Sequence, residues 1–484
     1  MAARVGLVRR AGIPLYRTDD LLVRLRQDER VQVDILTVGA DPTRAVDALP
    51  TLGWPGARCG YDVVLGPALD NPVRWEVYAS PSPGQTRPGR VVDSLLGDVT
   101  LDRIRAGRGH REHYRRQWGT GQRSLVLVLC DQGPASLLAH QPDLPQQLLG
   151  QLPVDEYQVV VALHPGLWHT WGPTAMAGWA RELLRAGALL LPAEAGWQAA
   201  IVAADHVIGD QGPMSAYAHR MGRHTMTAVP TPQRPGPALG VLHVREAVHA
   251  QLAADATRPN AHLFEHAHRR RSMPAQWGGE AVLTGLYAHL GLDPDPALPL
   301  VAPAGVAGIA HTDPDRIIRA RIPLVVSAEG DDREVVLRRW PLAAPPPDLH
   351  RPIVVIDVAE PHSRYREMAD LVLCPPTPGA DPWRVLDATI DAFAHPGLGS
   401  GPLVAVLHQD GCLLGLADTS RYRLCAVHSG AAMDPALLAC AFWAVRRYAH
   451  QRAHALTKEL TLLVRAGHQC VPVRITPVST RAHT

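Results

Sequence analysis

The sequence predicts an α/β fold, and three observations within residues 157–229 carry this prediction. First, the short apolar runs at 159–163 and 188–191 are typical of strands that are buried on both faces, as in parallel sheets. Second, the segment 174–186 between these runs has apolar side chains at helical spacing and ends before Gly187, a common helix terminator. Third, the alternation of strand, helix and strand continues to the end of the stretch, which is typical of a doubly wound parallel sheet.

The chain before this stretch predicts a smaller α/β unit over residues 1–95. Its apolar runs indicate three strands and one amphipathic helix, and residues 67–90 show little periodicity apart from 74–78. The expected strands are residues 4–8, 31–38 and 61–65, and the expected helix is 19–27.

A second unit is expected over residues 96–292, with the doubly wound stretch at its centre. Besides the elements above, the pattern predicts three strands and several helices, the last of which follow the sheet in the chain. These are a strand at 124–130, helices at 110–118, 135–138, 144–152, 197–204, 214–221, 242–254, 262–271 and 280–290, and strands at 206–209 and 224–229.

A separate α+β domain is expected over residues 300–484, after the Pro-rich linker 293–299. Apolar runs flank Asp410-Gly411, which is a strong hairpin signal, and a last hairpin is expected around Gly467. The domain carries no recognisable catalytic motif, so a protein partner is a hypothesis for its role.

The composition excludes several classes of protein. The 484 residues carry a formal net charge of +2, which does not indicate nucleic-acid binding, and Lys458 is the only lysine, so no lysine-based mechanism operates upstream of it. The seven cysteines are odd in number and lack C-x-x-C spacing, as expected of reduced thiols in a cytoplasmic protein. Arg9 and Arg10 interrupt the first apolar run, so we expect no signal peptide there. No apolar run approaches the ~18 to 20 residues that span a bilayer. Peripheral contact with a membrane stays open.

The candidate site residues follow the predicted strands. His164 follows the strand 159–163 and Asp210 follows 206–209, and ligands bind at the carboxyl ends of such strands. Backbone N–H groups at the start of the next helix, residues 212–215, would hold an anion without a lysine. Histidine suits proton transfer or a phosphate contact near neutral pH. The alternatives are a loop histidine and an N-cap aspartate.

A second turn has the same sequence as the Asp210 turn. Asp131-Gln132-Gly133-Pro134 follows the strand 124–130, so Gln132 and Gly133 are expected along the same sheet edge, unless this is only a similar strand-to-helix turn. The spacing of His262, His266 and His268 could suggest a metal, but no fourth ligand lies nearby, and a solvated helix is favoured. We therefore expect no metal and no cofactor.

A run of motifs in the middle of the chain resembles a known family. Gly97-Asp98, Asp102-Arg103, Tyr114-Arg115-Arg116, residues 131–134 and 142–145, His164-Pro165 and residues 204–210 resemble, in this order, an actinobacterial group related to CDP-glycerol glycerophosphotransferases. Those enzymes are similar to GT-B glycosyltransferases and UDP-N-acetylglucosamine 2-epimerases, in which two Rossmann-like halves face a cleft. The resemblance covers roughly residues 95 to 230.

The resemblance implies that the second half binds a nucleotide-activated polyol or sugar donor. It places His164-Pro165 against the donor phosphates and makes Asp210 the residue that opens a phosphate-binding turn. His164 and Asp210 are thus the expected catalytic residues. The expected ligand-binding residues are Gln132, Gly133, Pro165, Gly209, Gln211, Gly212 and Ser215.

Two departures from the family bear on catalysis. Residues 73–84 contain no histidine where the family offers a base for the acceptor hydroxyl, and Pro213 stands where a family member presents its phosphate-binding serine. A general base contributes roughly 100- to 10,000-fold in rate. The favoured hypothesis is therefore a GT-B-like protein that binds a nucleotide donor with degenerate catalysis. The alternatives are an active glycerophospho- or glycosyltransferase and a non-catalytic scaffold.

Overall fold

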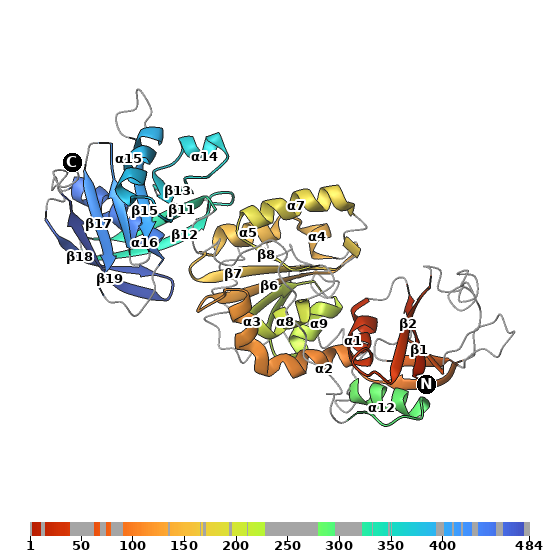
Figure 1. Cartoon of the computed structure of the whole chain (residues 1–484). Helices are drawn as coiled ribbons and strands as arrows, with labels where there is room; N and C mark the ends of the chain where they lie inside the picture. The colour runs from red at the N-terminus through yellow and green to blue at the C-terminus, as the bar shows by residue number, and fades with distance from the viewer. Residues whose placement is uncertain are drawn as a thin grey trace.

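The computed structural model has three bodies in a row, an N-terminal unit, a middle domain and a C-terminal barrel (Figure 1). It describes residues 2–10, 15–38, 62–67, 74–78, 91–133, 136–164, 166–167, 171–192, 196–210, 212–227, 279–295, 322–331, 333–346, 349, 351–393, 401–408, 411–417, 420–427, 434–451 and 458–478. The expected helices 242–254 and 262–271, with their three histidines, lie outside the described residues, as do the site residues Pro165 and Gln211.

The N-terminal unit contains a five-stranded sheet in the order β2-β1-β3-β4-β5. The strands β1, β2 and β3 are parallel, but β4 and β5 are antiparallel to their neighbours, so this half is not the wholly parallel Rossmann-like half that the resemblance implies. For β4 the reason is the short connection 68–73, because a parallel neighbour requires a crossover of a dozen or more residues. The bounds are β1 Ala3–Arg10, β2 Val31–Val38, β3 Val63–Pro67, β4 Arg74–Tyr78 and β5 Val91–Leu96.

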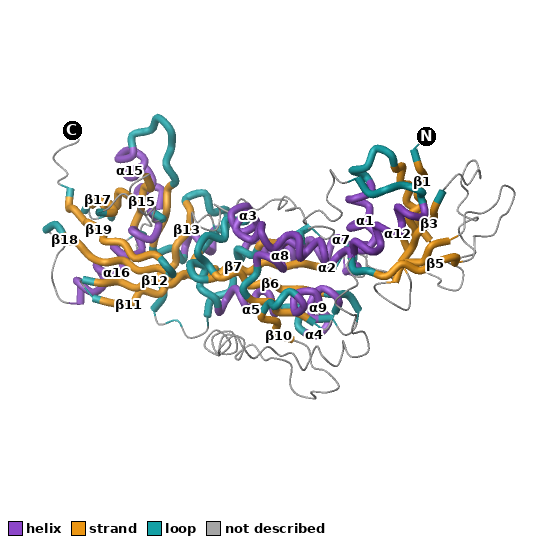
Figure 2. Tube along the Cα trace, turned by 90° about the horizontal axis from the view of Figure 1, so that it is seen from below, coloured by secondary structure: helices purple, strands orange, loops and turns teal. Residues whose placement is uncertain are grey.

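Two helices cover this sheet, and they come from distant parts of the chain. The helix α1 (Leu15–Leu25) follows the first strand, whereas α12 (Gly279–His289) follows the middle domain. Leu283, Leu286 and Tyr287 of α12 are buried in the same core as the first sheet. The chain thus returns to the N-terminal unit after the middle domain, and α12 and β5 lie side by side in Figure 1 and Figure 2.

The middle domain has the doubly wound parallel sheet that the sequence predicts. Its strand order is β10-β9-β6-β7-β8, and every pair is parallel. The strands are β6 Ser124–Cys130, β7 Tyr157–Leu163, β8 Leu189–Leu190, β9 His206–Gly209 and β10 His224–Thr227. Chain order reverses between β6 and β9, because β7 and β8 lie on one side of β6 whereas β9 and β10 lie on the other.

Helices cover both faces of this sheet (Figure 1). Side chains alternate along β6: Val126 and Val128 face one core, while Leu125 and Leu127 face the other. The first face packs against α4 (Leu137–His140), α5 (Leu144–Gln151) and α7 (Pro173–Arg185), and the second against α2 (Val99–Ala106), the 3₁₀ turn η1 (Gly107–His110), α3 (Arg111–Gln117), α8 (Trp197–Ala203) and α9 (Pro213–Arg220).

The C-terminal region forms a closed barrel, which corrects the expectation of an ordinary α+β domain. The nine strands β11 to β19 of the described residues pair in the order β11-β12-β18-β19-β17-β16-β15-β14-β13, and β13 pairs with β11 to close the ring. The strands are β11 Leu324–Gly330, β12 Glu334–Pro341, β13 Ile353–Asp357, β14 Leu371–Cys374, β15 Leu403–His408, β16 Gly411–Gly415, β17 Arg421–Ala426, β18 Leu460–Ala466 and β19 Gln469–Pro477. Both predicted hairpins, β15–β16 and β18–β19, are confirmed.

The helix α16 (Pro435–Gln451) explains why the barrel closes. Cys440 and Phe442 of α16 are fully buried in one cluster with the apolar side chains of the surrounding strands. The helix α15 (Pro382–Phe393) covers the opposite face of β13 to β16, and α14 (Ser363–Glu367) is a short exposed helix. Strands with apolar side chains on both faces need cover on both sides, which α16 and α15 supply.

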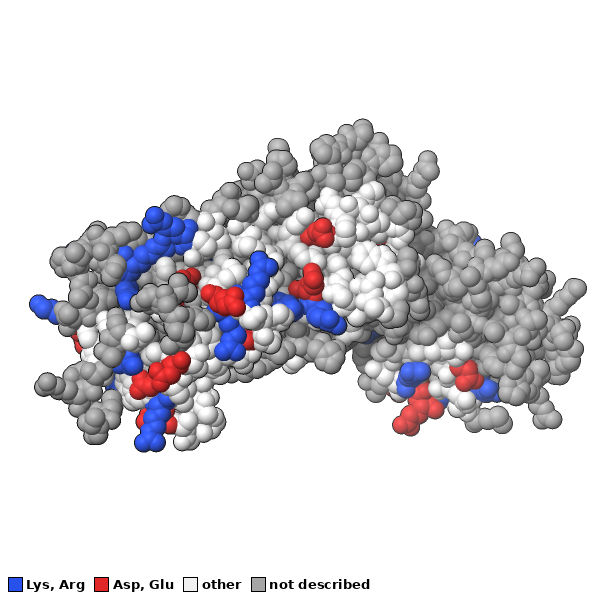
Figure 3. All heavy atoms as spheres, turned by 90° about the horizontal axis from the view of Figure 1, so that it is seen from above, with Lys and Arg blue, Asp and Glu red and all other residues white. Residues whose placement is uncertain are grey.

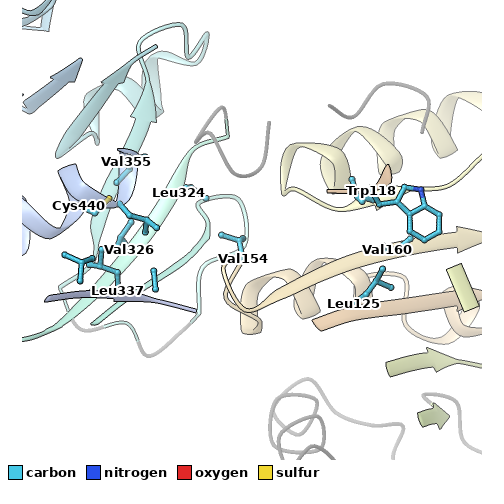
Figure 4. Packing of buried hydrophobic residues seen from close by; sticks show 14 of the residues in the cluster. Trp118, Leu125, Val154, Val160, Leu324, Val326, Leu337, Val355 and Cys440 are labelled. Carbon is cyan, nitrogen blue, oxygen red and sulfur yellow. The ribbon is translucent and has the colours of Figure 1, made fainter. Parts of the chain in front are cut away.

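The barrel is joined to the middle domain at the amino ends of β6 and β7. The backbone N–H of Val154 donates to the carbonyl oxygen of Arg339 at 2.8 Å, and Figure 4 shows Val154 between the two cores. The guanidinium of Arg339 donates from Nε and Nη2 to Asp155, at 2.9 and 2.6 Å, and from Nη1 to Asp434 at 2.6 Å. Burial alone would lower the pKa of Arg339, but the Asp155 and Asp434 carboxylates raise it well above its ordinary value.

The N-terminal unit meets the middle domain through a buried carboxylate. Asp20 of α1 accepts hydrogen bonds from Arg103 of α2 and from Nε2 of Gln198 at the start of α8, the latter at 3.1 Å. Because α8 follows β8, this contact lies toward the carboxyl edge of the middle sheet, opposite the barrel. The carboxyl edge therefore faces the side of the N-terminal unit (Figure 1).

Among the described residues, no helix combines the length and the apolar character that crossing a bilayer requires. Basic and acidic side chains are interspersed on the face seen in Figure 3.

Candidate functional site

The candidate site lies where the middle sheet changes winding direction. Asp131 follows β6, Asp210 follows β9, and His164 follows β7, so all three residues lie at the carboxyl edge of neighbouring strands. In doubly wound sheets the crevice at such a reversal is the usual ligand site. His164 and Asp210 are 46 positions apart in the chain. Both nevertheless lie at the carboxyl edge of the sheet, as the sequence predicts.

The carboxylate of Asp210 is occupied by backbone donors. Its Oδ2 accepts from the N–H groups of Asp131 at 2.9 Å and Leu137 at 3.2 Å, and its Oδ1 accepts from the N–H of Gly212 at 3.0 Å. Burial raises the pKa of this carboxyl; its backbone donors oppose the rise, and the neighbouring Asp131 charge adds to it. Through these hydrogen bonds Asp210 links the turn after β6 to the turn after β9. It is not the N-cap, which is Gly212.

The ring of His164 is held in one orientation by the turn that follows it. The ring Nδ1 accepts from the backbone N–H of Gly166 at 3.0 Å, and the backbone N–H of His164 donates to the carbonyl oxygen of Cys130 at 2.8 Å. A ring nitrogen that accepts a hydrogen bond carries no proton, so the proton of the neutral imidazole resides on Nε2. Burial lowers the pKa of His164, which the nearby Asp210 charge partly opposes. The neutral ring thus presents an Nε2–H donor.

Asp131 is a site residue that the sequence reasoning passed over. Its Oδ1 lies 4.0 Å from Nε2 of His164 and accepts from the N–H of Gln132 at 2.9 Å. Its Oδ2 lies against Gly212, where an added Cβ would be only 1.9 Å away. Burial raises the pKa of Asp131. Its position directly after a buried strand, like that of Asp210, was the signal that could have identified it.

The remaining predicted residues surround these three. The side-chain oxygen of Gln132 lies over Gly166, where an added Cβ would meet it at 1.6 Å, so Gln132 lies beside the His164 turn. Gly133 has a φ of +97° and open space around it. A Cβ on Gly209 would lie 2.3 Å from Oγ of Ser215, whose hydroxyl is fully buried and has no hydrogen-bond partner. A ligand would meet the backbone of this turn rather than that hydroxyl.

The start of α9 offers fewer donors than the sequence suggests. The N–H of Gly212 already donates to Asp210, and Pro213 has no N–H to donate. The first-turn N–H groups of Met214 and Ser215 have no partner within the helix. Because Oδ2 of Asp131 lies against Gly212, a phosphate at this helix start would meet a carboxylate.

The basic run on α3 is engaged within the domain. Arg111 and Arg115 both pair with Asp205, the latter through its Nη1 at 2.9 Å. These two arginines therefore stabilise the start of β9, whereas Arg108 of η1 and Arg116 of α3 are exposed.

A cavity separate from the candidate site lies at the junction between the middle domain and the barrel. It has a volume of about 290 Å³ and lies between the amino edge of the middle sheet and the barrel. Arg339 in its wall is neutralised by two carboxylates, and Arg123 donates to the carbonyl oxygens of Gly119, Thr120 and Val154. Burial lowers the pKa of Arg123 to about 10. These groups are already used in joining the two domains.

The described residues contain no group of three or more His, Cys, Asp or Glu side chains that could hold a metal ion. Cys130 directly precedes Asp131, and burial raises the pKa of its thiol well above the ordinary value.

Comparisons with known proteins give distant structural likenesses only. No protein-family model matches the chain, and no curated protein matches it. The similar solved structures include the crystal structure of UDP-GlcNAc 2-epimerase from Neisseria meningitidis bound to UDP-GlcNAc. The identity is 8%, the TM-score is 0.30, and the match covers 59% of this chain and 99% of that chain.

Proposed function

We propose that the carboxyl edge of the middle sheet binds a nucleotide-activated polyol or sugar, as the resemblance to CDP-glycerol glycerophosphotransferases implies. The observation that carries the proposal is the convergence of His164, Asp131 and the Asp210 turn at the reversal between β6 and β9. An Nε2–H donor and an ordered turn suit the recognition of a polar ligand at such a reversal.

Within this proposal the described residues serve binding rather than proton transfer. The neutral His164 has its Nδ1 engaged with Gly166 and its Nε2 protonated, so it cannot accept a proton from an acceptor hydroxyl in this arrangement. Asp210 already accepts three backbone hydrogen bonds. The proposed role of His164 is to donate a hydrogen bond to the ligand, and that of Asp210 is to hold the two turns in register.

One observation favours an active transferase as the second candidate. The carboxylate of Asp131 has a single hydrogen-bond donor among the contacts above, so it retains lone pairs that could accept a proton. Burial raises its pKa, which makes its carboxylate a stronger base than an exposed one.

Calorimetric titration of the full chain with CDP-glycerol, UDP-sugars and CDP, followed by a donor-hydrolysis and transfer assay, tests the proposal. Binding without turnover that is weakened in His164→Gln supports the binding protein. Binding with turnover that is lost in Asp131→Asn supports the transferase. If no nucleotide binds the wild-type protein, both candidates fail and the scaffold hypothesis remains.

A further inference from the structure

The side chains of His164 and Asp131 lie near each other without a direct hydrogen bond. The 4.0 Å between Nε2 of His164 and Oδ1 of Asp131 is too long for a direct hydrogen bond. A hydrogen-bonded oxygen lies about 2.8 Å from each of its partners, so one oxygen beside the pair can reach both atoms.

The two groups require an oxygen of one chemical kind. The Nε2–H of His164 needs an acceptor, because Nδ1 holds the lone pair that Gly166 uses. The carboxylate of Asp131 needs a donor. An alcohol hydroxyl accepts one hydrogen bond and donates another, whereas a phosphate oxygen at neutral pH has no proton to donate.

We propose that His164 and Asp131 together bind one alcohol hydroxyl of the ligand, with His164 as donor and Asp131 as acceptor. The proposal rests on the proposed function and deepens it, because it assigns this point of the site to the polyol or sugar rather than to the phosphates. The hydroxyl belongs either to the polyol part of the donor or to an acceptor alcohol, which share this chemistry.

The surroundings are consistent with this assignment. Asp131 lies against Gly212 at the start of α9, the position where the sequence alone predicts a phosphate. A phosphate there would be repelled by the carboxylate, whereas a hydroxyl would be attracted to it. The side chain of Gln132 lies over the His164 turn and adds a third polar group to the same rim.

The first test is independent of any nucleotide. We expect ¹⁵N NMR of the full chain labelled at histidine to show His164 neutral at pH 7 with its proton on Nε2, the signal being assigned by its loss in His164→Gln. Addition of free glycerol should shift the Nε2 signal in the wild type and in Asp143→Asn, but not in Asp131→Asn. Asp143 is an exposed residue of the same domain without a capping hydrogen bond, so it is the matched control. A proton on Nδ1, or a glycerol shift that survives in Asp131→Asn, would overturn the proposal.

The second test uses calorimetry with CDP-glycerol and CDP. Loss of a hydrogen bond to a charged group should weaken binding by about 10- to 100-fold. Asp131→Asn should weaken CDP-glycerol by this factor and leave CDP unchanged if the hydroxyl belongs to the donor. If the hydroxyl belongs to the acceptor, Asp131→Asn should leave both affinities unchanged and abolish only the glycerol-induced NMR shift. Equal weakening of CDP and CDP-glycerol would overturn the polyol assignment. If no nucleotide binds the wild type while the glycerol shift behaves as expected, the proposed function fails and the hydroxyl site stands.

Discussion

At the scale of the residue, two aspartates at matching positions have opposite roles. Asp131 and Asp210 each follow a buried strand, and burial raises the pKa of both. Among the described residues, the carboxylate of Asp210 accepts from three backbone N–H groups, whereas that of Asp131 accepts only from the N–H of Gln132. Strand position alone therefore cannot separate a structural carboxylate from a ligand-binding one.

Asp210→Asn should destabilise the protein by about 1–3 kcal/mol, because one side of an amide carries N–H groups that would face the backbone donors. Chemical denaturation at pH 7 measures this loss. A loss below about 0.5 kcal/mol, the range of ordinary surface substitutions, would contradict the structural role.

Asp131→Asn should raise stability at pH 7. A carboxyl whose pKa is raised in the folded state contributes stability that is fully present below its unfolded pKa of about 3.9 and is lost as the pH rises through the folded pKa. The amide of the variant does not titrate, so the variant does not lose this stability. Its stability advantage over the wild type should therefore shrink as the pH falls toward 4. Thermal unfolding as a function of pH measures it, and a variant less stable than the wild type at pH 7 would contradict the account.

At the scale of the element, the close approach of the β6 and β9 turns depends on Gly212. Its φ of −74° is open to any residue, so Gly212→Ala tests contact rather than backbone strain. The new Cβ would overlap Oδ2 of Asp131 and approach Oδ1 of Asp210, and such overpacking typically costs about 1–3 kcal/mol. Gly109→Ala, where nothing lies within 4 Å, is the control and should be neutral or slightly stabilising. Equal stability of the two variants in denaturation would count against the packing described here.

The sequence predicts elements well where their pattern is local. The buried run of β7 and the hairpin β15–β16 are confirmed because each rests on a short stretch of chain. The closed barrel depends on partners far away in the chain, such as β12 with β18, which periodicity does not report, and periodicity also does not give the antiparallel direction of β4 and β5. For the site, the sequence predicts the shared rim of His164 and Asp210 but not the hydrogen bonds that decide which group is occupied.

At the scale of the whole molecule, the barrel and the middle domain are joined by charge and close packing. Asp155 accepts two hydrogen bonds from Arg339, and a Cβ on Gly467 would lie 2.3 Å from the carbonyl oxygen of Asp155. A Cβ on Gly150 would lie 2.6 Å from the carbonyl oxygen of Ala344. This junction uses the amino edge of the sheet and leaves the carboxyl edge to the candidate site.

Arg339→Met should destabilise this junction by about 3–5 kcal/mol, because it leaves the buried carboxylate of Asp434 and the partly buried carboxylate of Asp155 without their partner. Adding Asp155→Asn and Asp434→Asn should recover part of the loss, since the unpaired charges are then removed. Calorimetric unfolding of the wild type, the Arg339→Met variant and the triple variant measures both effects. An Arg339→Met protein as stable as the wild type would show that the ion pairs do not hold the barrel in place.

A crystal structure of the full chain with CDP-glycerol tests the central claim most directly. We expect the ligand at the carboxyl edge between β6 and β9, with one hydroxyl oxygen, of CDP-glycerol or of glycerol added as an acceptor, within hydrogen-bonding distance of both Nε2 of His164 and Oδ1 of Asp131. A ligand seated in the cavity at the barrel junction, or a phosphate in contact with Asp131, would contradict it.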